Sequence, residues 1–123
     1  MAQCGMARIK VSVVFNSGAR IGPGKVKLLE SVHSTGSISA AARTMGMSYK
    51  RAWLLLDSIS QSFAQPVVSG APGGRHGGGA ALTPFGSRLL ARIKRIEAAA
   101  VAAARKDVAA LEKTARSEAG PKI

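Results

Sequence analysis

The stretch that decides the fold is Gly36–Phe63, which reads GSISAAARTMGMSYKRAWLLLDSISQSF. Ser37 is a good N-cap for a short helix, which we expect over Ile38–Met45. Gly46 follows directly, where a left-handed residue ends a helix and turns the chain. The stretch therefore begins with a short helix and a tight turn.

A second helix is expected to start at once after this turn. Ser48 is placed to cap it, and its apolar residues at 52, 56, 59 and 63 lie at helical spacing over Tyr49–Ala64. The small residues Ala41 and Ala42 allow the two helices to approach closely. Two helices joined by a short turn with Gly are typical of a helix-turn-helix, although an ordinary pair of packed helices has the same local pattern.

The flanking residues extend this motif into a winged domain. A strand is predicted over Ile9–Phe15 and a helix over Lys25–Ser34. Short strands are predicted over Pro66–Ser69 and Ala80–Thr83, on either side of the glycine-rich loop Gly70–Gly79. Strand, basic loop and strand form the pattern of a β-hairpin wing, and a plain flexible hairpin is the alternative.

A long helix is expected at the C-terminal end. Thr83 and Pro84 are a good N-cap and first helical residue, and the helix-forming composition continues to about Arg116. Such a helix is about 50 Å long, longer than a small domain is wide. One face carries the residues predicted to form a homodimer seam, unless the helix folds back on its own domain: Leu89, Leu90, Ile93, Ile96, Ala100, Ala103, Val108 and Leu111.

The predicted fold class is mainly α (α+β), a winged helix-turn-helix with a β-hairpin wing and a long C-terminal dimerisation helix. We expect a flexible N-terminus over 1–8, the DNA-binding domain over 9–88, the dimerisation helix over 89–116 and a disordered tail over 117–123.

The charge indicates a polyanionic partner. The 18 Lys and Arg against 6 Asp and Glu give a net charge of +12, and residues 1–95 carry 13 basic and 2 acidic groups (13 − 2 = +11). Nucleic acid is the commonest polyanion bound by such a domain. A single cysteine, Cys4, fits a reducing compartment, and no apolar run is long enough for a membrane helix. We expect a cytoplasmic, nucleoid-associated protein.

The candidate DNA-contacting residues lie in the two helices and the wing. Lys and Arg suit guanine in the major groove, whereas Ser and Tyr can bond phosphate. The candidates are Ser37, Ser39, Arg43, Ser48, Tyr49, Lys50, Arg51, Arg75 and His76.

Other residue types give no sign of catalysis or of a cofactor. His33 and His76 form no metal set, and the serines have no His–Asp arrangement beside them. The glycine loop lacks the Gly-Lys-Ser/Thr of a nucleotide-binding loop. We therefore expect no metal, no cofactor and no enzyme activity. Trp53 is expected in the core, and Leu54 or Leu55 must meet another element or subunit.

The segments GSISAAARTMGMSYKRAW and GGRHGGGAALTPFGSRLL resemble the N-terminal DNA-binding domain of the molybdate-responsive ModE regulators, and more distantly the LysR-type winged helix. The resemblance covers about residues 9–111. It implies a dimer that binds palindromic DNA near genes for molybdate transport or molybdoenzymes. It also implies a recognition role for Ser48, Tyr49, Lys50 and Arg51, and a wing role for Arg75 and His76, with Arg51 replacing the usual Ser.

The family's C-terminal molybdate-binding domains have no counterpart in these residues, so we expect no molybdate pocket. The hypothesis is a stand-alone DNA-binding version that binds constitutively or takes its signal from a separate partner. The alternatives are a non-specific architectural DNA-binding protein and a winged-helix protein-interaction module.

Overall fold

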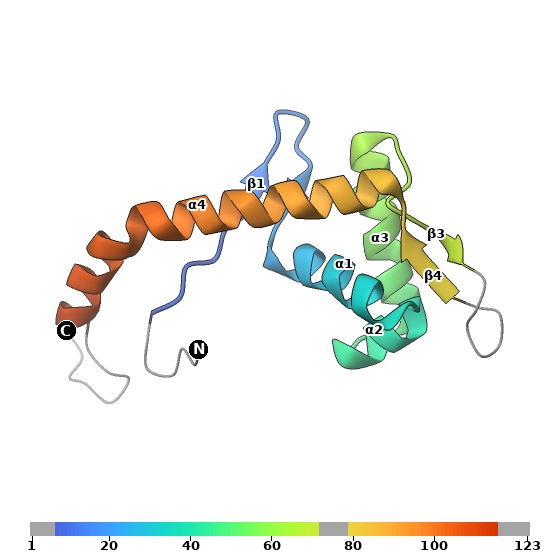
Figure 1. Ribbon diagram of the computed structural model, residues 1–123, viewed down its shortest axis with the longest axis horizontal. Helices are drawn as coiled ribbons and strands as arrows, with labels where there is room; N and C mark the ends of the chain where they lie inside the picture. The colour runs from blue at the N-terminus through green and yellow to red at the C-terminus, as the bar shows by residue number, and fades with distance from the viewer. Residues whose placement is uncertain (1–6, 72–78, 116–123) are drawn as a thin grey trace.

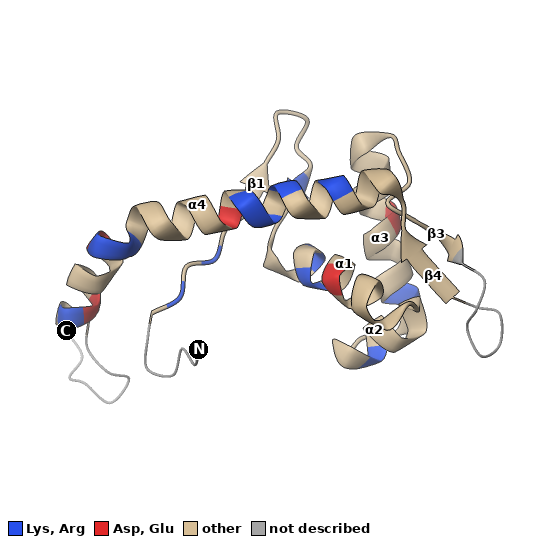
Figure 2. Ribbon diagram, in the orientation of Figure 1, with Lys and Arg blue, Asp and Glu red and all other residues tan. Residues whose placement is uncertain are grey.

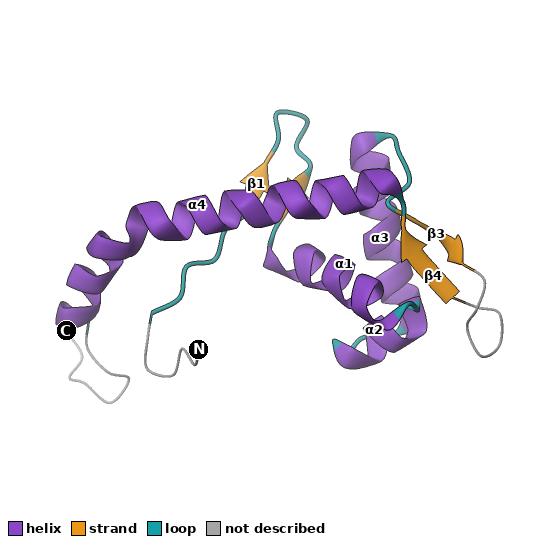
Figure 3. Cartoon of the chain, in the orientation of Figure 1, coloured by secondary structure: helices purple, strands orange, loops and turns teal. Residues whose placement is uncertain are grey.

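The computed structural model describes residues 7–71 and 79–115 and shows a small helical domain from which one long helix projects (Figure 1). Its helices and strands follow one another along the chain as β1 (Val13–Val14), β2 (Arg20–Ile21), α1 (Pro23–Thr35), α2 (Ile38–Thr44), α3 (Tyr49–Phe63), β3 (Val68–Ala71), β4 (Gly79–Leu82) and α4 (Pro84–Thr114). The predicted winged helix-turn-helix architecture is confirmed, and Figure 3 shows how strongly helices dominate it.

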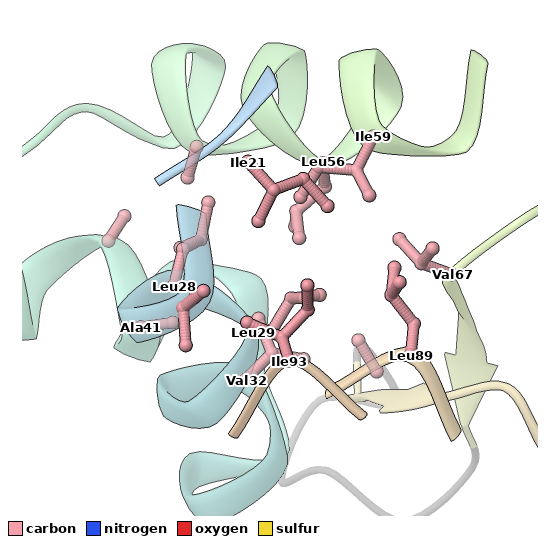
Figure 4. Close-up of a cluster of buried hydrophobic side chains, with 14 residues drawn as sticks. Ile21, Leu28, Leu29, Val32, Ala41, Leu56, Ile59, Val67, Leu89 and Ile93 are labelled. Atoms are coloured by element: carbon pink, nitrogen blue, oxygen red, sulfur yellow. The ribbon is translucent and has the colours of Figure 1, made fainter. Parts of the chain in front are cut away.

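The domain core lies where α1, α2 and α3 meet the hairpin and the first turns of α4 (Figure 4). Leu28, Leu29 and Val32 of α1 are fully buried, and Leu56 and Ile59 of α3 face them. Ala41, Ala42 and Ala52 are also buried. Their small side chains let α2 lie close to α1 and α3, as the sequence predicted.

The hairpin of β3 and β4 is antiparallel, with Val68 opposite Leu82 and Ala71 opposite Gly79. Both strands begin and end within two residues of the predicted positions. Two hydrogen bonds join the hairpin segment to the helices: the Ala80 amide donates to the carbonyl of Gly36, the residue after α1, at 2.8 Å, and the Val67 amide donates to the Ser60 hydroxyl of α3 at 3.0 Å. The wing is therefore held in a set position beside the helix-turn-helix.

The predicted strand over Ile9–Phe15 is wrong for most of its length, because only Val13–Val14 is strand. These two residues pair with β2, which the sequence did not predict. A strand needs a hydrogen-bonding partner, and β2 is only two residues long because α1 begins at Pro23. Among the described residues, no strand pairs with residues 7–12.

Three aromatic rings connect the N-terminal hairpin, α3 and α4. The Phe15 and Phe63 ring centroids are 5.5 Å apart, edge to face, and those of Phe63 and Phe85 are 5.7 Å apart. Such pairs add to the stabilisation from burial alone. They hold the C-terminal end of α3 against the first turn of α4.

Helix α4 starts as predicted, with the Thr83 hydroxyl accepting a hydrogen bond from the Gly86 amide at 2.9 Å. Its first half packs on the domain, where Lys94 Nζ lies 2.8 Å from a carboxylate oxygen of Glu30 in α1. This hydrogen bond raises the pKa of Lys94, because it favours the charged form of the amine. Its second half extends beyond the helical domain (Figure 1). No helix in the described ranges is both long and apolar enough to cross a membrane.

Candidate nucleic-acid interface

The turn between α2 and α3 sets the direction of α3. Gly46 has φ 68°, in the left-handed region predicted for it. The Gly46 amide donates to the Arg43 carbonyl at 3.1 Å, and the Met47 amide donates to the Ala42 carbonyl at 3.0 Å. This pair of bonds is the Schellman motif, which closes a helix and redirects the chain. A side chain at position 46 would strain this backbone, because residues other than Gly rarely adopt such a φ.

The capping serines take the positions that the sequence predicted. The Ser37 hydroxyl accepts from the Ala40 amide, and the Ser48 hydroxyl accepts from the Arg51 amide, each at 3.1 Å. Each serine therefore satisfies one of the free amides at its helix start. Contact between these serines and phosphate stays a prediction.

The first turn of α3 presents two cations to solvent. Tyr49, Lys50 and Arg51 are all exposed, while Ala52 on the inner side is completely buried. Within residues 7–71 and 79–115, the ion pairs found join Lys94 to Glu30 and to Glu97, so neither Lys50 nor Arg51 has an acidic partner there. Figure 2 shows that acidic residues are few around α2 and α3. The positive charge of this turn is free to meet an anion.

A groove of about 280 Å³ separates this turn from the wing. Ser39 of α2 lines it together with Tyr49 and Trp53 of α3, and Ser69 and Gly70 of β3 form part of the opposite side. Arg43 lies exposed on α2, one turn beyond Ser39. The structure thus brings Ser39 and Tyr49 to the side of the molecule that bears the wing, whereas Arg51 lines a separate pocket that also includes Arg20. Arg75 and His76, predicted for the wing tip, lie outside the described residues.

The prediction that Trp53 belongs to the core is wrong. Its side chain is 47% exposed and lines the groove beside the wing. Leu54 is 51% exposed, whereas Leu55 is half-buried against the core. Helical periodicity could have revealed both exposed residues. Leu54 lies about 200° around the helix from Ala52, and Trp53 follows Tyr49 by one turn on the wing side.

The predicted dimer seam on α4 divides into two parts. Leu89 and Ile93 are 9% and 6% exposed and belong to the core of their own domain, so the prediction that they face a second chain is wrong for these two. Leu90 is half-buried against the same core. The first turns of α4 pack against α1 and β4 and so bury these residues in the core of the domain.

The remainder of the predicted seam lies at the surface. Ile96 is 39% exposed and Leu111 is 68% exposed. Ala103 is exposed, while Ala100 and Val108 are half-buried. A groove of about 620 Å³ lies between the N-terminal segment, which contributes Ala7 and Ile9, and the second half of α4, which contributes Val108 among others. Apolar surface on a projecting helix is typical of an interaction site.

Among the residues that the structure describes, no group of three or more His, Cys, Asp or Glu side chains is placed to hold a metal ion.

Comparison with known proteins finds related sequences with regulatory and molybdenum-linked names. The chain is 51% identical over 86 residues to the molybdenum-pterin-binding protein MopB of Rhodobacter capsulatus, a match that covers 70% of the chain and 32% of MopB. It is 41% identical over 68 residues to the DNA-binding transcriptional dual regulator ModE of Escherichia coli K12, covering 55% of the chain and 26% of that protein. The chain thus spans about a third of the length of the curated relatives it matches. No family model matches it.

Among solved structures, the fold is similar to the CbnR DNA-binding domain in complex with DNA. The TM-score is 0.55 with 23% sequence identity, and the match covers 71% of this chain and 95% of that one. At this identity the likeness establishes the fold alone.

Proposed function

We propose that this chain, which is similar to MopB over 70% of its length and to ModE of Escherichia coli over 55%, is a sequence-specific double-stranded DNA-binding regulator that works as a homodimer. The observation that carries the proposal is the exposed pair Lys50 and Arg51 in the first turn of α3, which has no acidic partner among the described residues. The pair directly follows Tyr49, which lines the groove beside the wing. In helix-turn-helix proteins the N-terminal residues of the second helix reach base edges in the major groove.

In the proposed complex, the elements have different tasks. Helix α3 enters the major groove with Tyr49, Lys50 and Arg51 leading, and the wing lies along the adjacent backbone. Ser39 and Arg43 of α2 lie on the side from which phosphate oxygens approach. Phosphate contacts orient the domain, whereas the base contacts of α3 select the sequence. The chain acts by binding, and DNA binding places it at the nucleoid.

The names of the relatives suggest which genes are controlled. Both MopB and ModE carry names that refer to molybdenum or transcription regulation. We propose that the targets are genes for molybdate transport or molybdoenzymes.

The test of the proposed function is selection of bound sequences from a random DNA library at physiological salt. The expected result is an enriched palindrome with half-sites about one helical turn apart, roughly 34 Å. Binding without enrichment, with affinity that depends almost wholly on salt, would favour an architectural protein, which the net charge of +12 also allows. No binding to any DNA would contradict the proposal.

Replacing Lys50 or Arg51 by Ala is expected to weaken binding to the selected sequence by about 1–3 kcal/mol and to relax the preference at one base position. Fluorescence anisotropy with the selected and scrambled duplexes measures both effects. Lys106→Ala is the matched control, since it removes one exposed positive charge from the second half of α4. An equal loss on selected and scrambled DNA would show that the residue contacts only phosphate.

Two substitutions at Ser48 separate its capping role from its place at the interface. Ser48→Ala removes the bond to the Arg51 amide, and we expect a loss of about 1 kcal/mol in the free energy of unfolding. Ser48→Asp keeps a good N-cap, so stability is retained, but its carboxylate repels phosphate and DNA affinity falls. Thermal unfolding and DNA titration of both variants measure the difference. Unchanged affinity in Ser48→Asp would place Ser48 outside the interface.

A further inference from the structure

Leu54 is a large apolar side chain exposed on the outer face of α3. It is 51% exposed, and its neighbours on the inner face, Ala52 and Leu56, are 0% and 1% exposed. Lys50 lies one helical turn before Leu54 on the same outer face. Leu54 packs neither in the core nor among the partly buried residues around it, so the fold of the described chain does not explain a leucine here.

The surroundings of Leu54 suit a charged partner with a local apolar group. The cations Lys50 and Arg51 lie four and three residues earlier in α3, and both are exposed. A purely apolar partner would have to cover these charges, and burying an unpaired charge is costly. A DNA duplex offers phosphates for the cations, and its major groove has one apolar group, the C5-methyl of thymine.

The position of Leu54 also agrees with a base contact. Four residues of α-helix advance about 6 Å, so Leu54 lies roughly two base-pair steps from the position of Lys50 along the groove. Asp57 follows on the same side of α3, and its carboxylate would repel phosphate. The contacting part of α3 therefore ends near Leu54, in the second turn of the helix.

We propose that Leu54 contacts the methyl group of a thymine in each half-site and so makes the second turn of α3 a determinant of sequence preference. This inference rests on the proposed function, and it adds an apolar contact to the polar contacts of the first turn. This contact would explain why Leu54 is exposed in the free protein, because its apolar surface is buried against the thymine methyl group in the complex.

The test uses deoxyuridine, which lacks only the methyl group of thymine. Each thymine of the selected palindrome is replaced in turn, symmetrically in both half-sites, and the dissociation constant is measured at fixed salt. Burial of one methyl group corresponds to about a fourfold change in the dissociation constant. Substitution of the contacted thymine in both half-sites should therefore raise the dissociation constant roughly fifteenfold, and substitution at the other positions should change it little. The affinity of Leu54→Ala should not change when deoxyuridine replaces thymine at that same position. The affinity of Leu54→Met should still fall, because methionine keeps a long apolar side chain.

Gln61→Ala is the matched control, because Gln61 is exposed on the same face of α3 two turns beyond Leu54. This variant should keep the full sensitivity to deoxyuridine. Tight binding of the wild-type chain to a selected palindrome with no sensitive thymine would overturn the role of Leu54 and leave the proposed function intact. An unchanged loss of affinity on deoxyuridine substitution in Leu54→Ala would also overturn the role of Leu54 and leave the proposed function intact. Failure to bind any DNA would overturn both.

Discussion

Gly86→Ala is expected to lower the free energy of unfolding by about 3 kcal/mol, as overpacking against backbone does. A Cβ on Gly86 would fall against the Val67 carbonyl oxygen, well inside van der Waals contact, and would lie 3.0 Å from the Val67 carbonyl carbon. Since the obstacle is backbone, no side chain can rotate away. The first turn of α4 would have to move off β3.

That movement would break the contacts that hold α4 to the domain. The Thr83 hydroxyl donates to the Pro66 carbonyl at 2.7 Å, and the Thr83 amide donates to the Val67 carbonyl at 3.0 Å. Leu89 and Ile93 would then leave the core. Thermal unfolding followed by circular dichroism should show a fall in Tm of about 10 °C.

Gly24→Ala is the control for this substitution, and it should raise the free energy of unfolding instead of lowering it. Gly24 lies in the first turn of α1, and a Cβ there meets nothing within 4 Å. Removing a glycine from a helical position with free space raises stability by about 0.5 kcal/mol. A stable Gly86→Ala variant with the Tm of the parent chain would show that α4 is not packed against Val67 as the structure has it.

Ile96→Glu is expected to separate the proposed dimer and to lower the affinity for the palindrome about 100-fold or more. Ile96 is 39% exposed at the point where α4 leaves the domain, on the predicted seam. A carboxylate opposite its symmetry mate would have to be buried unpaired. Each monomer would then bind its half-site independently. The loss of this bivalent binding lowers the affinity for the palindrome 10²-fold or more.

Sedimentation velocity gives the oligomeric state, and DNA titration gives the affinity. Ala98→Glu is the matched control, since residue 98 is exposed two positions later and lies about 200° around the helix. This variant adds the same charge to the same part of α4 and should remain a dimer with full affinity. A wild-type chain that sediments as a monomer, yet protects a palindrome, would contradict the role assigned to α4.

Most of the fold could be predicted because its signals are local. A capping serine followed by a helical stripe requires only neighbouring residues, and Ser37 and Ser48 both cap as predicted. Gly46 adopts the left-handed conformation that the turn requires. For the same reason, the start of α4 at Thr83 and Pro84 was correct.

The errors arose where a residue's role depends on distant parts of the chain. Strand β1 is short because its partner β2 is short, and pairing between strands is not encoded in either strand alone. Leu89 and Ile93 have the helical spacing of a dimer interface. In the structure they are buried in the core of their own domain instead. An apolar stripe on a helix predicts that the face is buried and does not identify what buries it.

The helix-turn-helix, the position of the wing strands and the two cations at the start of α3 follow from local sequence, because caps, glycine conformations and helical periodicity act within a few residues. The packing of the folded chain was needed to establish that Trp53 and Leu54 face outward, that the first turns of α4 complete the core and that Gly86 lies against the backbone of Val67. These outcomes depend on how elements far apart in the chain share a limited interior, since close packing leaves each buried place to one side chain.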